Sequence, residues 1–138
     1  MKDGFTIIDS LSIPSDFEAV SQVEILVDNV CNKLGVNEDY YGNVLIAVTE
    51  AVNNAIDHGN KRDNSLDVLV AVGDNPNEFC FTVKDQGRGF DYENLPDPTA
   101  PENILKENGR GIFLMRNLAD VVEFEDAGRS VNIYFNKE

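Results

Sequence analysis

Glu50 and Asn54 are the first residues in the sequence whose types and spacing could do chemistry together. Positions i and i+4 lie on the same face of an α-helix, so a carboxylate and a carboxamide would be neighbours there. The same face also carries Asn43, Ala47 and Lys61, and it lies nearly opposite the apolar stripe of the predicted helix. Periodicity alone therefore favours a solvated surface at this place.

A second motif, D-x-G-x-G, is formed by Asp85, Gly87 and Gly89, directly after a predicted strand that ends at Val83. Aspartate and glycine both favour tight turns, so the run is typical of a simple turn. It also suits a purine site, because an ionised aspartate accepts a hydrogen bond from an exocyclic amino group. Two glycines would let a planar base approach the backbone closely. The motif alone leaves both interpretations open.

A third segment, Asn108-Gly109-Arg110-Gly111, precedes an apolar pattern that predicts a short helix. Glycines reach positive φ, and the amides at the start of a helix point at an anion, so the segment could seat a phosphate. It contains no GK[ST] of a P-loop and lacks the third glycine of a dinucleotide fingerprint. A plain junction between a loop and a helix is the alternative.

The elements that must position these motifs follow from hydrophobic periodicity and turn residues. In chain order we expect a strand at 5–8, a helix from the S-x-x-E capping box at Ser15 to Leu34, a helix at 37–58, a hairpin at 66–84, an irregular loop at 91–108, a short helix from Ile112, and a closing hairpin at 121–135. This order predicts one α+β domain over residues 1–138, a two-layer α/β sandwich. Its mostly antiparallel mixed sheet would have helices on one face.

The composition limits the classes of function. A formal net charge of −14, with 11 Lys and Arg scattered among 25 Asp and Glu, argues against direct nucleic-acid binding. An anionic nucleotide would need a cation and backbone amides to offset the repulsion. No apolar run of about 18 residues and no signal peptide is present, so we expect a cytoplasmic protein without a membrane segment. Cys31 and Cys80 lie in apolar patterns and are expected to be buried.

The order and spacing of the three motifs resemble those of the GHKL ATPase superfamily, whose fold is the Bergerat fold. Its N box matches Glu50 and Asn54, its G1 box matches Asp85, Gly87 and Gly89, and its G2 box matches Gly109 and Gly111. Within that superfamily the chain is most similar to the anti-sigma-factor serine/threonine protein kinases. The segments Thr49–Gly59, Leu95–Pro98 and Gly109–Met115 carry this similarity, which covers the chain from the first strand to Phe135.

The resemblance implies ATP and Mg²⁺ as cofactors and assigns roles to the motif residues. Glu50 would orient or deprotonate the attacking hydroxyl, Asn54 would ligate Mg²⁺, and Asp85 would hydrogen-bond the adenine amino group. The remaining nucleotide contacts would come from the glycines of both boxes and from the helix start, with Arg110 as a phosphate clamp or simply an exposed loop residue. The implied set is Gly87, Gly89, Gly109, Arg110, Gly111 and Ile112, together with Ser130, which stands where many relatives have threonine.

Three functions remain open at this point. The first is a Mg·ATP-dependent serine/threonine kinase that phosphorylates a small STAS-type anti-anti-sigma protein and sequesters a sigma factor or similar regulator. Its lid, at about 91–110, would bias the choice of partner. The second is a nucleotide-gated binding module with little or no transfer activity. The third is the detached ATPase part of a larger machine. The resemblance also implies a homodimer, and His58 is expected to pack or to compensate a helix dipole.

Overall fold

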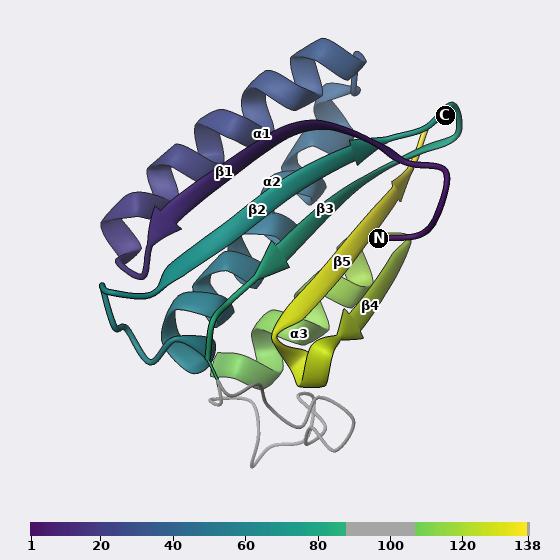
Figure 1. Ribbon diagram of the computed structural model, residues 1–138. Coiled ribbons are helices and arrows are strands. Elements are labelled where there is room, and N and C mark those ends of the chain that lie inside the picture. The colour runs from purple at the N-terminus through teal and green to yellow at the C-terminus, as the bar shows by residue number, and fades with distance from the viewer. Residues whose placement is uncertain (88–106, 138) are drawn as a thin grey trace.

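A five-stranded antiparallel sheet forms one layer of the protein and helices form the other (Figure 1). The computed structural model describes residues 1–87 and 107–137, with the backbone alone at 107–110 and 127. The strand order is β1-β2-β3-β5-β4. The strands are β1 (Thr6–Pro14), β2 (Asp67–Asp74), β3 (Glu78–Lys84), β4 (Val121–Glu125) and β5 (Ser130–Asn136). The predicted fold class is thus confirmed, with every pair of neighbouring strands antiparallel.

The helices lie together on one face of this sheet (Figure 1). They are α1 (Val20–Leu34), α2 (Glu38–Asn54) and α3 (Glu107–Leu118). Short turns join the elements: the 3-10 turn η1 (Phe17–Ala19) precedes α1, the π-turn η2 (Ala55–Gly59) follows α2, and the 3-10 turn η3 (Asp126–Gly128) connects β4 to β5. None of the helices within the described part of the chain is long and apolar enough to span a membrane.

The core lies between the helices and the inner face of the sheet. Alternate residues of the strands point to this side, so each strand contributes every second side chain. The fully buried inner-face residues include Val68, Val70, Val72, Phe79, Phe81, Ile133 and Phe135. Cys31 and Cys80 are buried free thiols, as the sequence predicted, and burial raises the pKa of each to about 11.

The start of the first helix differs from the sequence prediction. Ser15 is not the capping residue, because its hydroxyl donates to the carbonyl of Leu66 at 2.6 Å. Asp16 caps the turn instead, and its carboxylate accepts from the backbone N–H of Glu18 at 2.9 Å. The far end is as expected, since Gly35 has a φ of 69° and ends α1 in the left-handed conformation.

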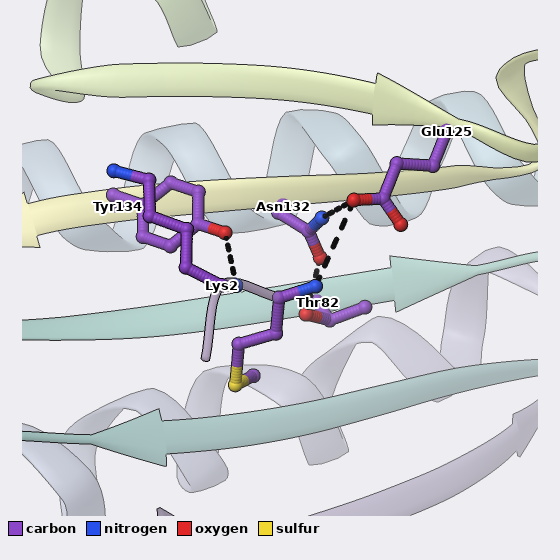
Figure 2. Close-up of polar contacts among 6 residues, drawn as sticks. Lys2, Thr82, Glu125, Asn132 and Tyr134 are labelled. Carbon is purple, nitrogen blue, oxygen red and sulfur yellow. Dashed lines mark hydrogen bonds and ion pairs between the residues drawn. The ribbon is translucent and has the colours of Figure 1, made fainter. Parts of the chain in front are cut away.

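The outer face of the sheet is partly covered by the first residues of the chain (Figure 2). The backbone N–H of Lys2 donates to the hydroxyl of Tyr134 at 2.8 Å, and the ammonium of Lys2 lies 4.3 Å from the centre of that ring. Beside it the amide of Asn132 donates to Glu125 at 2.9 Å, also drawn in Figure 2. These contacts bury Asn132 and Tyr134 completely on the side of the sheet away from the helices.

Candidate functional site

Glu50 and Asn54 are not on a solvated face, because α3 packs across the face of α2 that carries them. Ala47 on the same face has no exposed surface. A methyl group added to Gly111 of α3 would lie 2.8 Å from Oε2 of Glu50 and 3.3 Å from Nδ2 of Asn54. The expectation from periodicity was therefore wrong: the polar face lies under a second helix, which periodicity within α2 does not reveal.

The position of Gly111 also corrects the interpretation of the G-x-G segment. Helix α3 begins at Glu107, so Gly109, Arg110 and Gly111 lie within its first turns and Ile112 is not its start. Ile112 is 3% exposed and belongs to the core. At Gly111 the absence of a side chain permits close approach to Glu50 and Asn54, and this contact explains the glycine without a left-handed backbone.

The amide of Asn54 is a buried polar group with an unmet hydrogen-bonding need. Its Nδ2 has no hydrogen-bond partner among the described residues. A buried amide nitrogen without a hydrogen-bond partner destabilises a fold by about 1–3 kcal/mol. Such a nitrogen in a native protein therefore points to a ligand that binds beside it. A half-turn of the side chain would present Oδ1 at the same point, where it could ligate a cation.

Asp85 forms the other end of the site, at the end of β3. It is 5% exposed, and its Oδ1 accepts from the backbone N–H of Gly87 at 2.9 Å. Burial raises the pKa of this carboxyl, while the bond from Gly87 and the positive charge of Arg129 act in the opposite direction. A buried carboxylate with one remaining oxygen is well suited to accept from an amino group brought by a ligand.

A small cavity connects Asp85 to Asn54. It is lined by Ala51, Asn54, Ala55, Val83, Asp85, Met115, Phe124, Gly128, Arg129 and Val131. Its volume is ≈ 20 Å³, enough for about one water. A planar base could enter beside Asp85 only if side chains such as Met115 move aside, and methionine is the side chain best suited to such repacking.

A second, larger cavity of ≈ 560 Å³ begins at Asn54 and opens outward. Asn54 lines both cavities, so its amide stands between the space near Asp85 and the space near Glu50. The larger cavity is lined by Phe17, Glu50, Asn53, Asn54, Asp57, His58, Arg62, Gly111 and Leu114. His58 therefore faces this cavity, with Nε2 3.5 Å from Oδ2 of Asp57.

The π-turn η2 places the residues between α2 and β2 against Asp85. A single α-helix over 37–58 was predicted, but its last turn widens from Ala55 onward, as often happens at functional sites. A methyl group on Gly59 would overlap the carboxylate of Asp85, and one on Gly87 would overlap the carbonyl of Gly59. Gly59 was predicted only as the end of a helix, yet it is needed for this close approach.

Asn60 is a site residue that the sequence analysis missed. It is 1% exposed, its Oδ1 accepts from the backbone N–H of Gln86 at 2.8 Å, and its Nδ2 donates to Ser15 and to the carbonyl of Asp67. It thereby fixes the turn after Asp85 to the end of β1 and the start of β2. The only signal in the sequence was an asparagine directly after His58-Gly59, which by itself is typical of a turn.

Several predicted site residues remain untested. Gly89 and most of the predicted lid at 91–110 lie outside the described residues, and of Gly109 and Arg110 only the helical backbone is described. Ser130 is 7% exposed at the start of β5. Its neighbours Arg129 and Val131 line the small cavity, whereas Ser130 does not. Its contact with a ligand stays a prediction.

A divalent cation at this site would have to be coordinated by carbonyl oxygens of the protein and by oxygen atoms of a bound nucleotide. Within residues 1–87 and 107–137 no group of three or more His, Cys, Asp or Glu could hold a metal. Magnesium typically keeps several waters and uses one or two protein ligands together with phosphate oxygens. The side chain of Asn54 is thus a fitting single ligand for a magnesium–nucleotide complex.

Comparison with known proteins gives consistent results for sequence and fold. Residues 13–135 match the model of the histidine kinase-like ATPase domain. The chain is 30% identical to the serine-protein kinase RsbW of Staphylococcus aureus strains JH9 and Newman, over 93% of this chain and 87% of theirs. A crystal structure of the RsbU and RsbW domains of a Mycobacterium tuberculosis protein aligns with a TM-score of 0.63 and 15% identity, covering 95% of this chain and 32% of that one. That structure supports the fold alone.

Proposed function

The chain belongs to the histidine kinase-like ATPase family, in its anti-sigma-factor kinase branch, and we propose that it is a Mg·ATP-dependent protein serine/threonine kinase. Its substrate would be a small STAS-type anti-anti-sigma protein, and it would sequester a sigma factor or similar regulator. The observation that supports this most directly is the meeting of Glu50, Asn54 and Gly111 at the inner end of the large cavity.

In this proposal the nucleotide spans the two cavities and Asn54 lies where they meet. Asp85 accepts a hydrogen bond from the adenine amino group inside the small cavity. Gly111, with no side chain, leaves room for phosphates over Asn54, and the amide of Asn54 turns its oxygen toward Mg²⁺. When bound, ATP would supply a transferable phosphoryl group, and Mg²⁺ would supply positive charge that offsets the repulsion between the phosphates and an acidic protein.

Glu50 takes the role of general base toward the acceptor hydroxyl. It lines the open cavity, one helical turn from Asn54, so an acceptor that enters from solvent reaches both. Gly111 of α3 lies close to the carboxylate of Glu50, since a methyl group added there would come within 2.8 Å of Oε2. Glu50 would hold the attacking hydroxyl in line with the transferred phosphoryl group and would receive the proton of that hydroxyl.

The remaining parts of the proposal concern assembly. We propose one domain over residues 1–138, whose segment at about 91–110 acts as a lid and biases which partner is bound. A homodimer and a cytoplasmic location are proposed on the same family grounds.

Calorimetry and phosphate transfer together test the function. Titration of Mg·ATP into the protein should give a heat of binding that is lost when EDTA removes the metal. Transfer from γ-labelled ATP to STAS-domain proteins of the host should then label one of them on serine or threonine. Nucleotide binding with no transfer to any STAS protein would leave the alternative, a nucleotide-gated binding module. Absence of binding would refute both.

A further inference from the structure

The outer part of the large cavity contains an arginine that the proposed nucleotide contacts do not use. Nε of Arg62 donates to Oδ1 of Asp57 at 2.8 Å, and its guanidinium carbon lies 5.0 Å from the centre of the Phe17 ring. Its backbone has a φ of 60°, and its N–H donates to the carbonyl of Ile56 at 2.8 Å. A left-handed backbone is unfavourable for a residue with a side chain, so the fold holds Arg62 in this position against a conformational cost.

Charge distinguishes Arg62 from its surroundings. Among the described residues that line the cavity it is the one permanently charged cation, whereas Glu50 and Asp57 are acids. The hydrogen bond from Arg62 holds the pKa of the Asp57 carboxyl below its ordinary value, so this partner is ionised at neutral pH. Asp57 thus orients the guanidinium plane. A guanidinium has five N–H donors in a fixed fork and matches a carboxylate in two parallel hydrogen bonds.

An apolar surface lies on the same cavity wall. Phe17 is 42% exposed and Leu114 is 39% exposed, and both line the cavity together with Arg62. Aromatic residues, phenylalanine among them, and arginine are enriched in the cores of protein–protein interfaces. A phosphate chain would gain nothing from Phe17 and, with its higher charge, would be repelled by Asp57 more strongly than a single carboxylate. A peptide segment with one apolar and one acidic side chain would be complementary to both features.

We propose that Phe17, Asp57, Arg62 and Leu114 form an acceptor corner, at which Arg62 binds a carboxylate of the protein segment that carries the phosphorylated hydroxyl. The inference rests on the proposed function, because it assigns the docking place of that protein substrate. Arg62 is a specificity and positioning residue here, because it sets where the segment lies relative to Glu50. Asp57 and Phe17 fix the orientation of the Arg62 guanidinium.

The test measures binding rather than transfer. The probe is the STAS-domain protein that the wild-type chain retains in the presence of Mg·ADP, titrated against each variant. Arg62→Gln should weaken this binding about 10- to 100-fold, the usual effect of losing a hydrogen bond to a charged group. The matched control is Lys61→Gln, which removes the neighbouring exposed charge on the same left-handed turn and should change binding less than about twofold.

Two results would overturn the acceptor corner. The first is an equal effect of both variants, which would indicate only a general charge effect. The second is an Arg62→Gln variant that binds Mg·ATP more weakly but the STAS protein normally, because Arg62 would then be a phosphate clamp. Circular dichroism checks folding, and if Arg62→Gln does not fold, Arg62→Lys is used, since an ammonium keeps the charge but lacks the planar fork.

A charge exchange identifies the carboxylate. Arg62→Glu should abolish binding. Changing one acidic residue of the phosphorylated segment to arginine should then raise the affinity for the Arg62→Glu variant at least tenfold. Failure of every acidic position to restore binding would also overturn the proposal. The two proposals fail separately. A STAS protein that binds through Arg62 without being phosphorylated removes the kinase but keeps Arg62 as a docking residue for that protein. A STAS protein that is phosphorylated independently of Arg62 keeps the kinase and removes the acceptor corner.

Discussion

Gly59 and Asp85 lie so close that a methyl group on Gly59 would overlap the carboxylate of Asp85. The contact joins the π-turn after α2 to the end of β3, so it sets the depth at which Asp85 is buried. Because the overlap is with a short side chain packed inside the fold, the strain cannot be relieved by a simple rotation into solvent. This one contact links the position of the proposed adenine acceptor to the glycine after His58.

Gly59→Ala should therefore lower the free energy of unfolding by about 1–3 kcal/mol, the usual range for overpacking. Urea denaturation followed by circular dichroism measures it. The matched control is Gly42→Ala in α2, where an added methyl group meets no atom within 4 Å and should stabilise the helix by about 0.5–1 kcal/mol. The loss at Gly59 should shrink when Asp85 is also replaced by alanine. An unchanged loss in that double variant would show that the contact is not the cause.

Asp85→Asn separates stability from binding. Burial raises the pKa of Asp85 in the folded state above its ordinary value of 3.8, so the folded protein holds this proton more tightly than the unfolded chain. The ionised carboxylate of Asp85 hence destabilises the fold at pH values above its raised pKa. Asp85→Asn should be more stable than the wild type at pH 7, and this advantage should disappear below about pH 3.8, where both states are protonated. Urea denaturation across pH measures the difference.

The same variant should bind adenine nucleotides about 10- to 100-fold more weakly, because a charged acceptor is replaced by a neutral amide. For the wild type, affinity should fall as acidification protonates Asp85, at a pH above the ordinary carboxyl range. Calorimetry with Mg·ATP tests both statements. Affinity that is equal for wild type and Asp85→Asn would place the adenine elsewhere.

The sequence predicted the two hairpins, the fold class and the glycine end of α1, because these depend on local periodicity and turn chemistry. The first strand was predicted only at 5–8, whereas β1 extends to Pro14, because Asp9 to Pro14 pair with β2. It did not predict that α3 covers Glu50 and Asn54, since the relation between two helices lies outside the pattern of either one. The same limit applied to Ser15, whose hydroxyl bonds to Leu66, 51 residues away, instead of capping its own helix. Motif spacing singled out Asp85 and Gly87 as candidates, whereas Gly59 and Asn60 matter through contacts with residues that are distant in the sequence, such as Asp85 and Gln86.

Asn60→Ala should destabilise the protein and loosen the turn after Asp85. The backbone N–H of Gln86 would lose its partner, at a cost of about 1–3 kcal/mol, whereas the hydroxyl of Ser15 would lose one bond and keep the one it donates to Leu66. Thermal unfolding measures the loss, and Asn64→Ala, at an exposed position of the same loop, is the control. Hydrogen exchange should show faster exchange at Gln86 than in the wild type. Normal protection there would mean that other contacts hold the turn.

Glu50→Gln should reduce phosphate transfer while leaving the nucleotide bound. A positioned general base contributes about 10²–10⁴-fold, so the single-turnover rate with labelled ATP should fall by that factor. The glutamine keeps the size of the side chain beside Gly111, so the affinity for Mg·ATP should stay within about twofold. Glu24→Gln, an exposed acid on α1, controls for the change in net charge. If Glu50→Gln transfers phosphate at the wild-type rate, Glu50 is not the base, and the acceptor hydroxyl must lose its proton to another group.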